Sequence, residues 1–117
     1  MPYQVVKTLC SAVTDTGEKD TVNFQRRIDQ AGTLFVEESG SGTFSLTIEG
    51  RMDSGDTFTA IPVDGSASTS TSGAVTAVTE ADADNSAFVA FAFPILPQMR
   101  VNISANSGST LTVKIDE

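Results

Sequence analysis

The chain has 117 residues, the size of one domain, and its 7 Lys and Arg against 15 Asp and Glu give a formal net charge of −8. So acidic a surface repels phosphate backbones, and we expect no nucleic-acid partner. Histidine is absent, which excludes His-based catalytic triads and His-ligated metal sites.

The first half of the chain predicts short strands separated by polar, Gly-containing turns. The clearest pattern is at residues 43–50, where Phe44, Leu46 and Ile48 alternate with polar residues, as in a half-buried strand. Further strands are expected at residues 3–13, 21–28, 34–36 and 57–63, with turns at 15–20, 39–42 and 53–56. Phe58 and Ile61 are expected to supply the apolar side chains of the strand at 57–63.

The second half begins with residues 64–73, a Ser/Thr/Gly-rich stretch that predicts a flexible loop. A short strand follows at 74–79, and the polar connection before Ala87 has room for one helical turn at most. Alternating residues at 100–105 and at 111–116, joined by a short polar loop, predict a C-terminal β-hairpin. About eight strands and no long amphipathic helix indicate one all-β domain over residues 1–117, an antiparallel β-sandwich of the jelly-roll or immunoglobulin-like kind.

Residues 87–93 form a strand that is apolar on both faces. Its three aromatic residues cannot all share one face, so either a loop of the same domain or another molecule covers the second face. The second alternative predicts a homo-oligomer, a trimer or a dimer, with an interface formed by Phe88, Phe91, Phe93, Ile95 and Leu96. Residues 1–6 are either an arm that adds a strand to a neighbouring molecule or an ordinary first strand.

The residues that could carry chemistry are few, and structural roles explain them best. Cys10 is the single cysteine, so it forms no internal disulfide, and its apolar surroundings predict a buried, inert thiol. The adjacent Glu37 and Glu38 point to opposite faces of a strand and cannot share a proton. Glu80, Asp82 and Asp84 would line one face of an extended chain and could collect Ca²⁺, but a solvated acidic loop is the preferred interpretation.

We therefore expect no catalytic residue, no cofactor and no bound metal, and hence no enzyme. No signal-peptide pattern is visible, and no apolar run approaches the roughly 20 residues of a membrane span. The sequence accordingly predicts a protein made in the cytoplasm without membrane contact.

Residues 43–61 and 99–115 together resemble two hairpins of small virion structural proteins of tailed bacteriophages. The first is similar to a T-x-T-I-E-G-like strand, a Gly-containing turn and a strand with an aromatic residue. The second is similar to the closing R-V-x-I/V and T-V-x-I/V strands of those proteins. The resemblance implies a β-sandwich in the virion, most simply a capsid decoration or cement protein that binds the major capsid protein on the outer face of the shell. A tail, neck or fibre component is the alternative, followed by a carbohydrate-binding or adhesion module.

Overall fold

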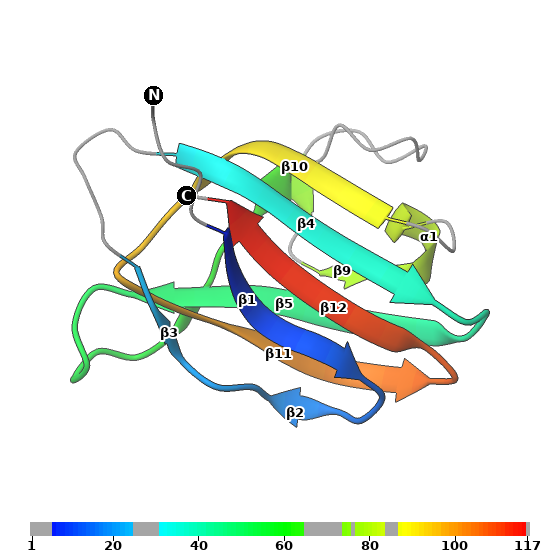
Figure 1. Cartoon of the computed structure of the whole chain (residues 1–117). Helices are drawn as coiled ribbons and strands as arrows, with labels where there is room; N and C mark the ends of the chain where they lie inside the picture. The colour runs from blue at the N-terminus through cyan, green and yellow to red at the C-terminus, as the bar shows by residue number, and fades with distance from the viewer. Residues whose placement is uncertain (1–5, 25–30, 65–73, 76, 84–86, 117) are drawn as a thin grey trace.

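The computed structural model of the chain describes residues 6–24, 31–64, 74–75, 77–83 and 87–116. Two antiparallel sheets pack against each other in a sandwich (Figure 1). This arrangement confirms the predicted all-β sandwich. Six of its strands have seven or more residues, and in the described part of the chain the remaining strands have two residues each.

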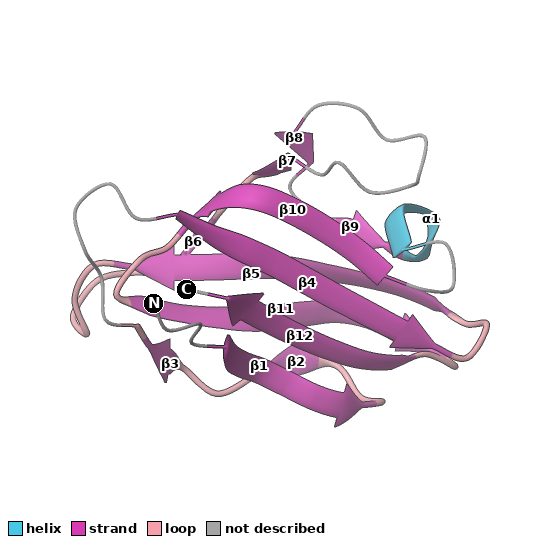
Figure 2. Cartoon of the chain, turned by 45° about the horizontal axis from the view of Figure 1, so that its top comes forward, coloured by secondary structure: helices cyan, strands magenta, loops and turns pink. Residues whose placement is uncertain are grey.

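Long strands form the first sheet, which we call sheet A. Their order across the sheet is β1 (Val6–Val13), β12 (Thr110–Asp116), β4 (Ala31–Ser39) and β10 (Ala87–Pro94). Sheet B is built on two long strands with short ones at its edges. The order across it is β2 (Gly17–Glu18), β11 (Gln98–Ser107), β5 (Thr43–Arg51) and β6 (Thr59–Ala60). Two more short strands also pair with the long ones: β3 (Val22–Asn23) with β11, and β9 (Val78–Thr79) with β5. A separate ladder joins β7 (Val63–Asp64) to β8 (Ala74–Val75), and α1 (Glu80–Ala83) is a single helical turn (Figure 2).

The core lies between the two sheets and is filled mainly by alternate residues of the long strands, although the adjacent Leu9 and Cys10 of β1 are both buried. On β5 the buried side chains are Phe44, Leu46 and Ile48, as the alternation predicts. Strands β11, β12 and β4 add further buried side chains, which include Met99, Val101, Ile103, Leu111, Val113, Ile115, Leu34 and Val36. Because strand side chains alternate between faces, the residues between these point away from the core and form the two outer faces.

The predicted C-terminal hairpin is wrong, although both of its strands exist. Strand β11 pairs with β5 in sheet B, whereas β12 pairs with β1 and β4 in sheet A. The turn between them therefore crosses from one sheet to the other, and the turn between β4 and β5 does the same.

Gly40 and Gly108 lie against each other in these two turns, and both have positive φ (+87° and +84°). A Cβ on Gly40 would lie 2.6 Å from the Gly108 carbonyl oxygen. This contact and these backbone angles favour glycine at both positions.

Several boundaries also differ from the sequence prediction. Only Val22–Asn23 is strand within the described part of 21–28, since residues 25–30 lie outside the described ranges. The expected strand at 57–63 is two short strands, β6 and β7, and the expected turn at 15–20 contains β2. The loop predicted at 64–73 and the arm predicted at 1–6 fall on residues that are outside the described ranges, except at Asp64 and Val6.

Candidate interaction surface

The residues that the sequence analysis assigned to an interface lie largely in the core. Phe88, Phe93 and Ile95 are no more than 2% exposed, so they cannot meet another molecule, and for these three the prediction is wrong. Leu96 is partly buried against the core, and the side chain of Phe91 lies outside the described part.

A change of register explains the error. Along β10 the pairing with β4 shifts between Ala90 and Phe93. Phe88 and Phe93 differ by an odd number of residues, so a regular strand would place them on opposite faces. The irregularity reverses the alternation between them, and both rings face the core.

The outer face of sheet A carries an unexpected aromatic residue, Phe35. Its neighbours along β4, Leu34 and Val36, are fully buried, so Phe35 points to the opposite, solvent side. The pairing register places Lys114 of β12 beside it on one side and Val89 of β10 on the other. From the sequence, Phe35 is expected only as a member of the strand at 34–36, although three apolar residues in succession are a signal for a strand with two covered faces.

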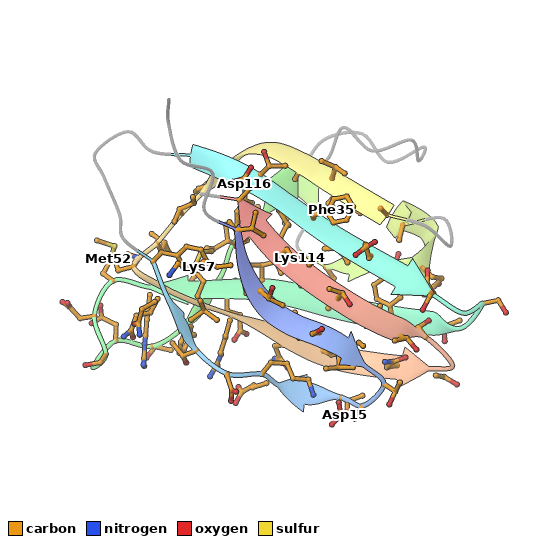
Figure 3. All side chains as sticks on the ribbon, viewed as in Figure 1. Lys7, Asp15, Phe35, Met52, Lys114 and Asp116 are labelled. Carbon is orange, nitrogen blue, oxygen red and sulfur yellow. The ribbon has the colours of Figure 1, made fainter. Side chains whose placement is uncertain are left out.

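We call this surface the A face and define it by its outward-facing side chains. They are Val6 and Thr8 of β1, Thr112, Lys114 and Asp116 of β12, Thr33, Phe35 and Glu37 of β4, and Ala87 and Val89 of β10. Figure 3 shows Phe35, Lys114 and Asp116 together on this face, far from Met52 in the loop after β5.

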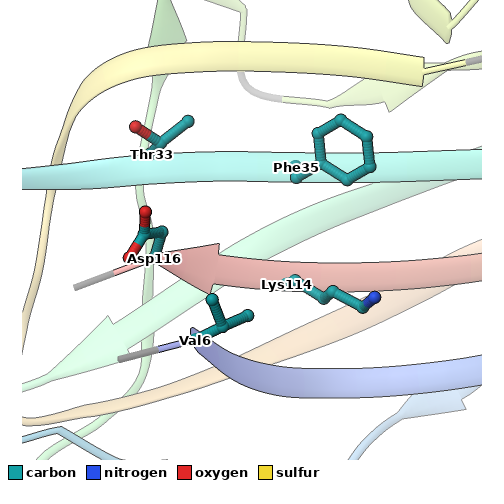
Figure 4. Close-up of a pocket in the computed structure, with 5 residues that line it drawn as sticks. All are labelled: Val6, Thr33, Phe35, Lys114 and Asp116. Atoms are coloured by element: carbon teal, nitrogen blue, oxygen red, sulfur yellow. The ribbon is translucent and has the colours of Figure 1, made fainter. Parts of the chain in front are cut away.

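An open depression of about 350 Å³ lies on the A face, lined by Val6, Thr33, Phe35, Lys114 and Asp116 (Figure 4). Val6 is 55% exposed and adds apolar surface to this depression. A smaller depression of about 190 Å³ lies near the other end of β12 and β4, where Thr112 and Glu37 are among its lining residues. The A face is therefore hollowed along its strands, with an apolar centre and charged residues around it.

The edges of sheet A are less suited to contact than its face. Strand β1 is irregular between Thr8 and Cys10 and again between Cys10 and Val13, and Ala12 has a φ of +50°. Strand β10, at the other edge, has its own irregularity and ends at Pro94, which has no amide hydrogen to donate. Bulges and proline are the features that protect edge strands from pairing with other chains. The addition of a strand from another molecule is therefore disfavoured at both edges.

The outer face of sheet B is different, because its side chains pair with one another. Arg100 forms ion pairs with Glu49 (2.7 Å) and Glu18 (2.9 Å). The Phe58 ring, expected to contribute apolar mass to a strand, lies on this outer side with its centroid 3.9 Å from the Arg100 guanidinium carbon and 4.3 Å from that of Arg51. These charges are already partnered within the chain.

A hydrogen-bonded row continues beside this cluster. The Arg51 Nε donates to the Gln98 Oε1 at 2.7 Å, and the Gln98 Nε2 donates to the Asn23 Oδ1 at 3.0 Å. The row joins β5, β11 and β3. It makes the outer face of sheet B polar, in contrast to the apolar centre of the A face.

The carboxylates that the sequence singled out have structural roles where the structure describes them. Glu37 is exposed while Glu38 is buried, which confirms that they point to opposite faces, and the Ser109 hydroxyl donates to Glu38 at 2.6 Å. Glu80 accepts a hydrogen bond from the Phe44 amide at 2.8 Å. In the turn at 53–56, the Asp53 amide donates to the Asp56 carboxylate at 3.1 Å.

A cation site at 80–84 gains no support from this geometry. Glu80–Ala83 is helical rather than extended, so alternate carboxylates do not line one face. The Asp82 side chain and the whole of Asp84 lie outside the described part. Among the described residues no group of three or more Cys, Asp or Glu side chains is placed to hold a metal ion.

Cys10 is buried, as predicted, and burial raises the pKa of its thiol. Its sulfur lies 3.9 Å from the Leu111 carbonyl oxygen. A thiolate at this position is disfavoured, so the site does not activate a nucleophile. None of the described helices is long and apolar enough to cross a membrane.

Comparison with known proteins gives a likeness in fold. The chain matches no protein-family model and no curated protein sequence. Among solved structures it is similar to the crystal structure of the SPBc2 prophage-derived protein YomS, with a TM-score of 0.68 and 14% sequence identity. The match covers 99% of this chain and 94% of YomS. The chain therefore has the fold of a prophage-derived protein over almost its whole length.

Proposed function

We propose that the chain is a non-enzymatic structural protein of a bacteriophage virion, and specifically a capsid decoration or cement protein on the outer face of the shell. The observation that carries the phage part of the proposal is the fold match to the prophage-derived protein YomS, which extends over 99% of this chain. The virion role itself is supported by the resemblance of residues 43–61 and 99–115 to hairpins of tailed-phage virion proteins.

The side-chain chemistry supports a structural role. The acidic residues that a catalytic mechanism would need are used to hold the fold: Glu49 pairs with Arg100, Glu38 accepts from Ser109, and Glu80 accepts from the Phe44 amide. What the described residues offer instead is a contact surface with an apolar centre. A virion protein needs such a surface for contacts with its neighbours in the assembly, among them other copies of the same chain, because these contacts depend on the burial of apolar area.

The net charge limits how attachment can work. At −8, copies crowded on a shell repel one another, so affinity depends on local complementarity. Apolar burial contributes about 25 cal/mol per Å², so a patch of about 400 Å² contributes about 10 kcal/mol before the cost of association is subtracted. Since that cost is of similar size, one small contact per molecule is marginal. Attachment through several copies at once would strengthen it.

The copy number per particle tests the proposal. Purified virions are digested, and the protein is quantified by mass spectrometry against the major capsid protein as the internal standard. Hundreds of copies per particle are expected for a decoration protein. Three, six or twelve copies would instead assign it to the tail, neck or fibre, and its absence from virions would refute a structural role altogether.

Shell binding in solution tests the mechanism of attachment. Purified protein is added to shells that lack it, and bound protein is measured by sedimentation at low and high salt. Attachment through apolar contacts predicts that binding changes little between about 0.05 M and 0.5 M salt. Release at high salt would contradict apolar attachment and indicate an ion-paired contact.

A further inference from the structure

The A face has the properties of a surface that another molecule covers. Phe35 lies at its centre, with Val89 beside it on the edge strand β10, and Val6, 55% exposed, lies at the opposite margin. An outer sheet face that meets only water carries polar side chains at such positions. In the described part of the chain Lys114, directly beside Phe35, forms no ion pair. A cation and an aromatic ring are thus both available to a partner.

The arrangement of these residues fits a second copy of the same chain. Two identical faces related by a two-fold axis must be complementary to themselves. If a residue of one copy contacts a second residue of its partner, the same contact forms again with the two copies exchanged. The pairing register places Lys114 opposite Phe35, Asp116 opposite Thr33, and Thr112 opposite Glu37. Each of these three rows therefore places a charged side chain beside an aromatic or a hydroxyl side chain.

We propose that the A face is the interface of a homodimer, with a two-fold axis that runs along the strands between β12 and β4. In this packing the Lys114 side chain lies on the partner's Phe35, and Phe35 lies under the partner's Lys114. Thr112 then meets the partner's Glu37, as a hydroxyl and a carboxylate group that can form a hydrogen bond, and Asp116 lies over the partner's Thr33.

An axis that runs along either single strand is less favourable. An axis along β12 would place Lys114 against the partner's Lys114, and an axis along β4 would place Glu37 against the partner's Glu37. Like charges in direct contact across an interface are unfavourable. The axis between the two strands avoids both contacts, and it lets four strands of each copy overlap along their whole length, as in aligned sheet packing.

The size of the face predicts a weak dimer. Four strands about 4.8 Å apart and about eight residues long, at about 3.3 Å per residue, give a flat area of about 500 Å² per copy. The total of about 1,000 Å² is at the lower limit for specific interfaces. On a shell, where neighbouring copies are held close together, such a contact is sufficient because the effective concentration is high.

The mass in solution tests the inference. Sedimentation velocity of the intact protein between about 5 µM and 500 µM should show a reversible increase from the mass of one chain to the mass of two, a range in which weak complexes assemble. Phe35→Asp should remove the dimer over this range. Lys114→Glu should weaken dimerisation at least tenfold, because it places a carboxylate against the partner's ring and near its Glu37.

Thr47→Asp is the matched control, since Thr47 is a half-buried residue on the outer side of β5 in sheet B. It should dimerise as the unaltered protein does, and far-UV circular dichroism should show all three variants folded. A monomer at 500 µM, or a dimer that Phe35→Asp leaves unchanged, would overturn the inference. A monomer whose shell binding is lost on Phe35→Asp would instead assign the A face to the shell.

This inference does not depend on the virion role. Absence of the protein from virions would refute the proposed function and leave the dimer intact. A monomeric protein found in virions would do the reverse.

Discussion

Replacement of Phe88 by alanine tests whether its ring belongs to the core or to an interface. The side chain is fully buried and lies on β10 opposite Val36 of β4. A buried phenylalanine removes roughly 200 Å² from water, which contributes about 5 kcal/mol at 25 cal/mol per Å², and alanine retains only a small part of that. Phe→Ala substitutions in cores cost about 3–5 kcal/mol. We therefore expect Phe88→Ala to lower the free energy of unfolding by about 4 kcal/mol.

The thermal midpoint provides the assay. An unfolding entropy of about 2.1 cal/mol/K per residue amounts to about 250 cal/mol/K for 117 residues, so a loss of 4 kcal/mol lowers Tm by about 16 °C. Since this loss is a large part of a typical domain's stability, Phe88→Leu serves as a milder variant, with an expected loss of about 1–1.5 kcal/mol and a Tm lower by about 5 °C. Circular dichroism at low protein concentration measures both variants.

Phe35→Ala is the matched control, because Phe35 lies on the neighbouring strand but points to the solvent side. In a dilute, monomeric sample it should cost less than about 1 kcal/mol, as a side chain near the surface. An unchanged Tm of Phe88→Ala in dilute solution, together with a lower mass of an oligomer, would refute the core position of this ring. That result would return Phe88 to an interface.

Two further substitutions test local packing. Gly50→Ala should lower the free energy of unfolding in urea denaturation by about 1 kcal/mol. A Cβ there would lie 2.6 Å from the Leu96 Cδ1 and 2.9 Å from the Ile61 Cδ1, and these ends of flexible side chains can shift at a small cost. Gly55→Ala, with nothing within 4 Å of the added Cβ, should be close to neutral, and equal effects at the two sites would contradict the packing. Burial raises the pKa of the Cys10 thiol above its ordinary 9.0, so the contribution of the neutral thiol to stability is complete below pH 9 and is lost as the pH rises further. Above pH 9 the urea midpoint of the unaltered protein should therefore fall more steeply than that of Cys10→Ala. Parallel pH profiles of the two proteins would contradict this.

The sequence by itself determined the class of the fold and most of the core. Alternation with a period of two identifies which side chains share a face whatever the partner strand is. The residues on the apolar side of the strongest patterns, such as Leu46, Ile48, Val113 and Ile115, are therefore buried as predicted. The separation of Glu37 from Glu38 followed from the same period.

Only the tertiary structure decided which strands pair. The alternation in 100–105 and in 111–116 is the same for a hairpin and for a turn that crosses between sheets, because in both cases the apolar side faces the core. The pairing of β11 with β5 and of β12 with β4 depends on contacts between distant parts of the chain, which no local pattern contains.

The same limit applies to the candidate surface. A shift of register within β10 turned Phe93 toward the core, and a shift of this kind leaves no mark on composition or periodicity. The A face takes its residues from β1, β12, β4 and β10, which are neighbours only in the folded sheet. Phe35 became a candidate contact residue because the fold placed Lys114 and Val89 on either side of it, and a sequence of alternating strands does not specify those neighbours.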